Sequence, residues 1–174
     1  MAEFTDVDAS FAQLEQEIQT LETQAVTELV RAAGMLMDEL LERTPVWSGR
    51  AVRNFRWGVN GAGFGGEIEP IGGPGYVPGA GWRAQREIDP GPTNSMALGS
   101  EPRRPANEEA ARAEMEAMLS GVTKLVNLSV TNTSSNWDLV DGGSAPVPGR
   151  SRTPGGVSAL AEQATVSRLG DNWQ

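Results

Sequence analysis

The first part of the chain carries apolar residues at steps of three and four, which is the spacing of an amphipathic helix. The positions are Phe11, Leu14, Ile18, Leu21, Ala25, Leu29, Ala32, Leu36 and Leu40. Acidic residues are expected on the opposite face, at Glu15, Glu17, Glu22, Glu28, Asp38 and Glu42. Ser10 and Gln13 form a candidate capping box, and Pro45 ends the helix because it excludes Thr44 from the α region. The pattern therefore predicts one long helix over residues 11–41.

This helix is too long for the domain to which it belongs. About 33 helical residues at 1.5 Å each give a rod of roughly 50 Å, whereas a compact domain of this chain length is roughly 40 Å across. Either the helix bends at Gly34, or a second subunit covers the projecting part of its apolar stripe. The second alternative is favoured.

The pattern after the helix changes to a period of two. Residues 51–59 alternate in a way that predicts a strand with Phe55 and Trp57 turned inward. Residues 60–106 then hold most of the glycines and prolines, with no sustained apolar period. So long an irregular segment indicates function, disorder or an arm. Because Tyr76 and Trp82 are among its apolar residues, an arm that contacts a partner surface is favoured over a flexible linker.

The rest of the chain predicts two helices and two strands, the second strand being a short apolar piece after residues 125–131, so that the predicted order is α-β-(arm)-α-β-β-α. Asn107 can cap the second helix, and the apolar stripe of that helix is Ala111, Met115, Met118 and Val122. Residues 125–131 alternate as a strand, and residues 157–169 predict a third, short helix. This order predicts one α+β domain over residues 1–174: a long N-terminal helix packed on a small antiparallel sheet, with one or two further helices and a long Gly/Pro-rich projecting arm.

The composition removes most routes to catalysis. The 174 residues include no cysteine and no histidine, so thiolate chemistry and the commonest general base are excluded. No stretch reaches the roughly 18 to 20 apolar residues of a membrane span, and the acidic N-terminus lacks the apolar core of a signal peptide. We therefore expect no enzyme, no cofactor, no metal and no contact with a membrane.

Two short motifs have the residue types of a binding site but lack the sequence context that such a site requires. Gly61, Gly63 and Gly66 have the spacing of a dinucleotide-binding loop, but the residues EIEPIGGP that follow cannot begin the helix that would hold the pyrophosphate. Asp138 and Asp141 lie near a Gly-rich turn, but no further oxygen ligands follow at a recognised spacing for a cation. Neither motif predicts a site.

The charge pattern combines a net charge of −9 with basic residues that are almost all arginine. Such an acidic chain is unlike a free nucleic-acid-binding protein, which neutralises phosphates with Lys and Arg. Arg50, Arg53 and Arg56 recur at every third residue, and on a strand Arg53 would lie on the face opposite to the other two. Three interpretations stay open for them: ordinary surface charges, ion pairs with an acidic face such as the helix of a neighbouring copy, and contacts with DNA phosphates.

Two stretches of the sequence resemble the neck and tail-completion proteins of tailed bacteriophages. The first is the long helix followed by TPVWSGRAVRNFRW, in which the matching residues are Thr44, Pro45, Val46, Gly49 and Arg50. The second is SVTNTSSNWDLVDGGSAPVPGRSRTPGGVSALAEQA, in which they are Leu139, Gly142 or Gly143, Ser144, Pro154, Gly155 and Gly156. The chain departs from the family pattern at Trp47 and Trp137, and its arm over residues 61–104 has no counterpart there.

The resemblance implies a non-enzymatic structural virion protein that forms a ring, six- or twelve-fold, at the phage head-tail junction. Its partners would be further copies of itself, the portal or connector, and the tail-tube or terminator proteins. DNA would pass through the channel without sequence-specific binding. The protein would be made in the bacterial host cytoplasm and end in the neck or tail region of the virion. The alternatives are a tail terminator that caps the tail tube and a non-viral cytoplasmic module that pairs through its long helix.

An interface in such a ring joins one patch of a subunit to a different patch of the next copy. An acidic helix face and an arginine-bearing strand are a suitable opposed pair. The residues expected at a subunit or partner interface are Trp47, Arg50, Arg53, Arg56, Tyr76, Trp82, Trp137, Asp141 and Ser144.

Overall fold

The computed structural model describes residues 4–44, 49–71, 103–135, 137, 141 and 156–171, and it has the predicted α+β architecture. Its elements are α1 (Phe4–Arg43), α2 (Arg50–Arg53), β1 (Phe55–Val59), α4 (Arg103–Leu119), β2 (Leu128–Asn132) and α6 (Val157–Asp171). The predicted arm lies mostly outside the described residues. Its start, over residues 62–71, is irregular, and its last residues belong to α4.

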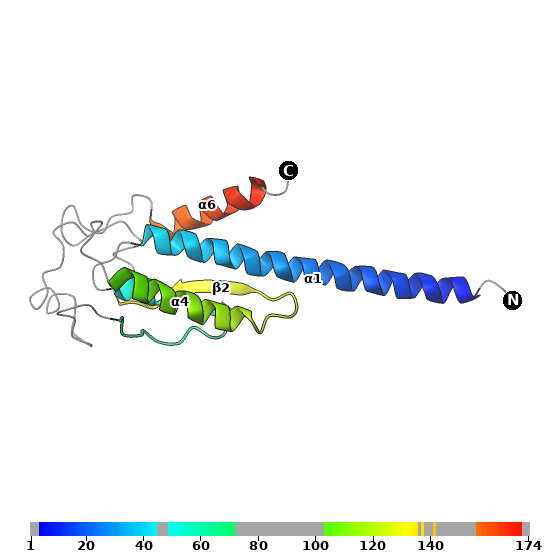
Figure 1. Ribbon diagram of the computed structural model, residues 1–174, viewed down its shortest axis with the longest axis horizontal. Coiled ribbons are helices and arrows are strands. Elements are labelled where there is room, and N and C mark those ends of the chain that lie inside the picture. Colours follow the sequence, from blue (N-terminus) through cyan, green and yellow to red (C-terminus); the bar gives the residue numbers. More distant parts are fainter. Residues whose placement is uncertain are drawn as a thin grey trace, which may run out of the picture.

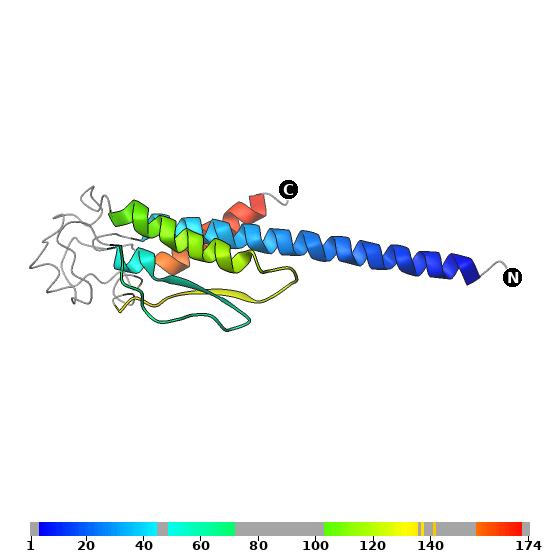
Figure 2. The same cartoon turned by 60° about the horizontal axis from the view of Figure 1, so that its bottom comes forward.

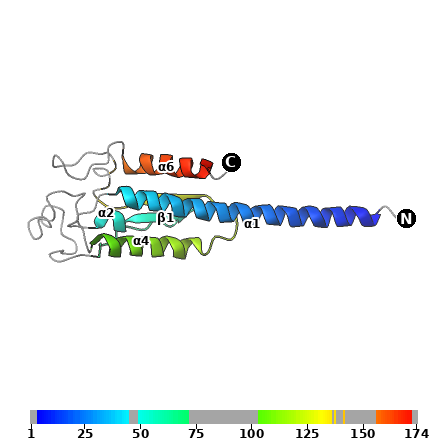
Figure 3. The same cartoon turned by 45° about the horizontal axis from the view of Figure 1, so that its top comes forward.

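The body of the protein is built around the C-terminal half of α1. Helices α4 and α6 both pack on this half (Figure 1, Figure 3). β1 and β2 form a two-stranded antiparallel sheet in which Phe55 lies opposite Asn132 and Val59 lies opposite Leu128, and α4 covers β1. The core contains Ala33, Met37, Leu40, Leu41, Val52, Phe55, Trp57, Ala111, Met115, Leu119, Val157 and Ala161.

The C-terminus of α1 lies where the sequence predicts it, but its N-terminus does not. The helix begins at Phe4, so Ser10 lies inside it and the predicted capping box is wrong. It also runs through Gly34 as one element without the bend that we considered (Figure 2). At the other end, the guanidinium of Arg104 donates hydrogen bonds to the carbonyl oxygens of Leu41 (3.0 Å) and Thr44 (2.7 Å). These bonds satisfy carbonyl groups that the end of a helix leaves without a partner.

The predicted strand over residues 51–59 is wrong in its first part. Residues 50–53 form the short helix α2, which follows Gly49 in the left-handed conformation (φ 83°). Ala51 and Val52 are both buried, whereas adjacent residues of a strand point to opposite faces. A helical turn lets both side chains enter the core, and the strand then starts at Phe55.

The boundaries of the second helix and second strand also differ from the prediction. α4 begins at Arg103, so Asn107 lies inside it and does not cap it. The second strand occupies residues 128–132, a few residues later than the alternating pattern over 125–131. No helix within the described residues is long and apolar enough to cross a membrane.

The N-terminal half of α1 projects well beyond the body in all three views (Figures 1, 2 and 3). Every residue from 9 to 24 is exposed, whereas Ala33, Met37, Leu40 and Leu41 further along the helix are buried. We call residues 9–24 the stalk. At 1.5 Å per residue the whole helix is about 60 Å long, so the predicted overhang is present.

Candidate functional site

The three regularly spaced arginines all form ion pairs within the chain. Arg50 reaches Glu67 (2.7 Å) and Glu69 (3.3 Å). Arg53 (2.5 Å) and Arg56 both bind Glu114 on α4, although a strand over residues 51–59 would have placed them on opposite faces. Each arginine side chain is less than one-fifth exposed.

These ion pairs decide between two of the interpretations that the sequence left open. The arginines are not ordinary solvated surface charges, because their side chains are mostly buried and their guanidinium groups lie against carboxylates. The ion pairing suggested by the sequence is observed, with carboxylates of the same chain. A contact of the same arginines with a neighbouring copy stays a prediction.

The segment that follows β1 is held to the body by a buried asparagine. Asn54 is completely buried, and its side-chain amide pairs with the backbone of Ile68: the Ile68 N–H donates to Oδ1 (2.6 Å) and Nδ2 donates to the Ile68 carbonyl (2.8 Å). Nδ2 also donates to the carbonyl of Arg50 (2.8 Å). The side chain thus provides the pair of hydrogen bonds that a neighbouring strand would otherwise give.

A second buried asparagine, Asn107, makes the same pair of hydrogen bonds to Ile71, three residues after Ile68 in the chain. The N–H of Ile71 donates to Oδ1 of Asn107 (2.8 Å), and Nδ2 of Asn107 donates to the Ile71 carbonyl (2.7 Å). Asn107 is completely buried on α4 and lies against Gly49, where a β-carbon would overlap its side-chain amide. Residues 66–71, here called the anchored segment, are therefore fixed at both Ile68 and Ile71.

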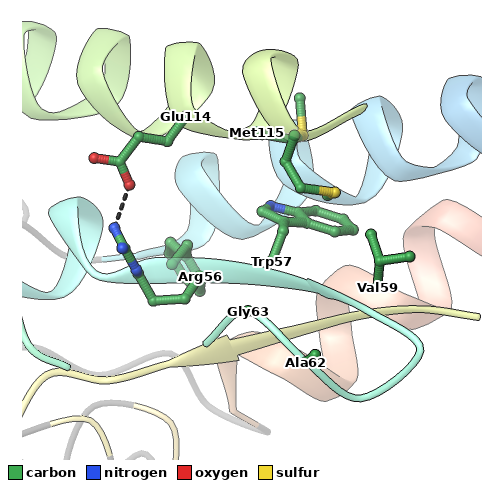
Figure 4. A pocket seen from close by; sticks show the side chains of 9 residues that line it. Arg56, Trp57, Val59, Ala62, Gly63, Glu114 and Met115 are labelled. Carbon is green, nitrogen blue, oxygen red and sulfur yellow. Dashed lines mark hydrogen bonds and ion pairs between the residues drawn. The ribbon is translucent and has the colours of Figure 1, made fainter. Parts of the chain in front are cut away.

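A cavity of about 450 Å³ lies beside β1 (Figure 4). Trp57, Val59, Met115 and other apolar groups line most of it, and its charged groups, Arg56 and Glu114, bind each other. The indole N–H of Trp57 is buried without a hydrogen-bond partner. Within the described ranges, no group of three or more acidic side chains is placed to hold a metal ion. The cavity is suited to an apolar group.

Two of the remaining predicted interface residues support the body. The ring of Trp137 meets that of Phe55 edge to face, with centroids 5.2 Å apart. Oδ1 of Asp141 accepts a hydrogen bond from the backbone N–H of Ser158 (2.7 Å), at the N-terminus of α6, where a carboxylate is favoured by the helix dipole. The other four predicted residues, Trp47, Tyr76, Trp82 and Ser144, lie outside the described residues, as does Asp138.

The stalk carries a surface that the predicted interface residues missed altogether. Its large apolar side chains remain substantially exposed: Phe11 61%, Leu14 51%, Ile18 47% and Leu21 64%. They follow one another at steps of three, four and three, which gives one line along the helix. The overhang of the predicted helix indicated this surface in the sequence, whereas the resemblance and the regularly spaced arginines indicated other residues.

The acidic residues of the stalk are not on the face opposite to this line, as the sequence analysis expected. At 100° per residue, Glu15 and Glu22 lie about 60–80° to one side of the apolar line and Glu17 lies about 80° to the other. The stalk therefore presents an apolar line bordered by carboxylates on both sides, with Gln16 and other uncharged residues behind it.

Comparisons of this chain with protein-family models, with curated proteins and with solved structures give no match. The resemblance to phage neck proteins therefore depends on the two sequence motifs.

Proposed function

We propose that this protein is a non-enzymatic structural component that acts by assembly, as a ring at the head-tail junction of a tailed phage. The observation that carries the assembly part of the proposal is the projecting half of α1, whose four large apolar side chains are left in water and need a covering partner in the assembled junction. The two motifs supply the viral context. The lack of histidine and cysteine in the sequence supports the non-enzymatic part.

The free energy of the stalk supports assembly. Full burial of a Leu, Ile or Phe side chain contributes about 1.5–3 kcal/mol, and the four side chains are about half exposed. Covering what remains exposed would contribute about 3–6 kcal/mol in total. The stalk lacks the tertiary packing that supplies most of the stability of helices in proteins, so a partner would also stabilise the helix itself.

In this proposal the assembled ring joins the portal or connector to the tail, and DNA passes through its channel. The net charge of −9 suits a channel that does not bind DNA. A tail terminator that caps the tail tube would use the same assembly. A cytoplasmic module that pairs through its helix is the second candidate, because the stalk alone is sufficient for it.

The test is the mass and shape of the purified full-length protein, alone and mixed with a connector or tail-tube protein. Native mass spectrometry and negative-stain imaging should show rings of six or twelve copies, alone or on the partner. A protein that stays a monomer or dimer in every mixture would refute the neck proposal and favour the helix-pairing module.

A further inference from the structure

We infer that the stalk is one half of a coiled coil whose other half is a helix of a different polypeptide, with Lys or Arg on both sides of its apolar line. This inference rests on the proposed function only in taking the stalk as a docking surface. It goes further in naming the chemistry of the partner.

The spacing along the stalk is that of a coiled-coil seam. Phe11, Leu14, Ile18, Leu21 and Ala25 are separated by three, four, three and four residues. Phe11, Ile18 and Ala25 thus occupy a positions and the two leucines occupy d positions of a heptad repeat. This narrow line differs from the broader buried face that the same helix presents to the body.

The charged residues of the stalk are placed only beside that seam. Residues 9–24 contain three charged side chains, Glu15, Glu17 and Glu22. Glu15 and Glu22 are at e positions and Glu17 is at a g position, where side chains face the partner helix and set partner choice. The outer positions hold uncharged residues such as Gln13, Gln16 and Gln19. Charges needed only for solubility would instead lie on that outer side.

A second stalk is a poor occupant of the seam. In a parallel pair of stalks Glu17 would face Glu22 of the other copy, and the stalk has no Lys or Arg to offset this repulsion. An antiparallel pair also places acidic residues against acidic residues. A partner with basic residues at these positions changes each repulsion into an attraction.

The described body of a second copy is also a poor occupant, because its described basic side chains, apart from the exposed Lys124, are already engaged. Arginines at positions 31, 43, 50, 53, 56, 104, 112 and 168 each pair with a carboxylate of their own chain. Binding the stalk there would require breaking such pairs. The charge pattern therefore favours a different polypeptide.

The test uses the full-length protein and two synthetic helical peptides of four heptads, with Ile at a and Leu at d. One peptide has Lys at all e and g positions and the other has Glu. Fluorescence anisotropy at low salt should show binding of the Lys peptide at least about tenfold tighter than the Glu peptide, with an affinity that falls as salt rises.

Two triple variants of equal net charge separate the seam from net charge. Glu15→Gln, Glu17→Gln and Glu22→Gln together remove three negative charges from the seam and should abolish the peptide preference. Gln13→Lys, Gln16→Lys and Gln19→Lys raise the net charge by the same three units, but on the outer side, and should keep the preference for the Lys peptide. Because all six residues are exposed, the folding of the body is unaffected by either change.

The inference is overturned if the Lys peptide does not bind, if both triple variants change the preference alike, or if the protein alone forms oligomers that Leu14→Asp dissociates. The last result would identify a second copy as the occupant. Rings without any peptide preference would contradict this inference and leave the proposed function standing. A peptide preference in a protein that never forms rings would support this inference and contradict the proposed function.

Discussion

Replacing Asn54 by alanine should release the anchored segment and destabilise the whole body. The side chain is completely buried and makes hydrogen bonds to both backbone groups of Ile68 and to the carbonyl of Arg50. Truncation leaves these three polar groups without their partner, and each buried group so left costs about 1–3 kcal/mol. Because the anchored segment is partly exposed, water can reach some of them. We therefore expect a loss near the lower end, about 3 kcal/mol in the free energy of unfolding.

The assay is urea unfolding followed by tryptophan fluorescence, since Trp57 is buried in the core. A midpoint that falls at an unchanged m-value reports the loss of stability. Asn127→Ala is the matched control, because this exposed residue loses the same atoms and should change stability by less than about 0.5 kcal/mol. Proteolysis after Glu67 by a glutamate-specific protease should accelerate in Asn54→Ala alone. If both variants unfold at the same urea concentration, Asn54 does not hold the segment.

Three further substitutions test the body. Gly49→Ala should lower the free energy of unfolding by more than about 2 kcal/mol, because its positive φ disfavours a side chain and a β-carbon would overlap a buried amide. Gly61→Ala has the same backbone strain but open space around it, so thermal unfolding should show a smaller loss. Gly34→Ala, in a helix interior with nothing near it, should raise stability by about 0.5–1 kcal/mol in urea unfolding, and a loss there would contradict the continuous helix. Glu114→Gln should cost about 1–2 kcal/mol, because two arginines lose their carboxylate, while Glu116→Gln on the exposed side of α4 should leave the melting temperature unchanged.

Local patterns in the sequence were sufficient for the parts of the fold that local physics controls. The three- and four-residue spacing predicted α1 as a helix, and Pro45 predicted its end. The helix over residues 157–169 corresponds closely to α6. In both stretches the apolar period indicates a helix, and in α1 the helix-ending residue agrees with it. The helical conformation is therefore strongly favoured there over any other secondary structure.

The parts that failed depend on contacts between residues far apart in the chain. Asn107 was expected at a helix N-terminus, where asparagine is favoured, but it lies inside α4. Its low helix propensity there is offset by hydrogen bonds to Ile71, thirty-six residues away in sequence. Arg104, which satisfies the end of α1, and Arg53, which reaches Glu114, are of the same kind. No local pattern contains these partners.

The candidate surfaces show the same division. The arginines are candidates for an interface because arginine suits interface ion pairs, but their spacing could not show that Glu67, Glu69 and Glu114 lie within reach. The stalk could have been identified from sequence, because its heptad spacing and the placement of its charges are local. The sequence could not show that the body ends before the stalk and therefore leaves residues 9–24 exposed.

The two halves of α1 therefore respond differently to substitution. The C-terminal half is held by packing and by the carbonyl contacts of Arg104, so changes there alter the stability of the body. The stalk makes no contribution to that core, so its seam and its glutamates can change with little effect on folding. A partner-binding specificity located in the stalk can be altered separately from the fold, because partner binding and folding depend on different residues of one helix.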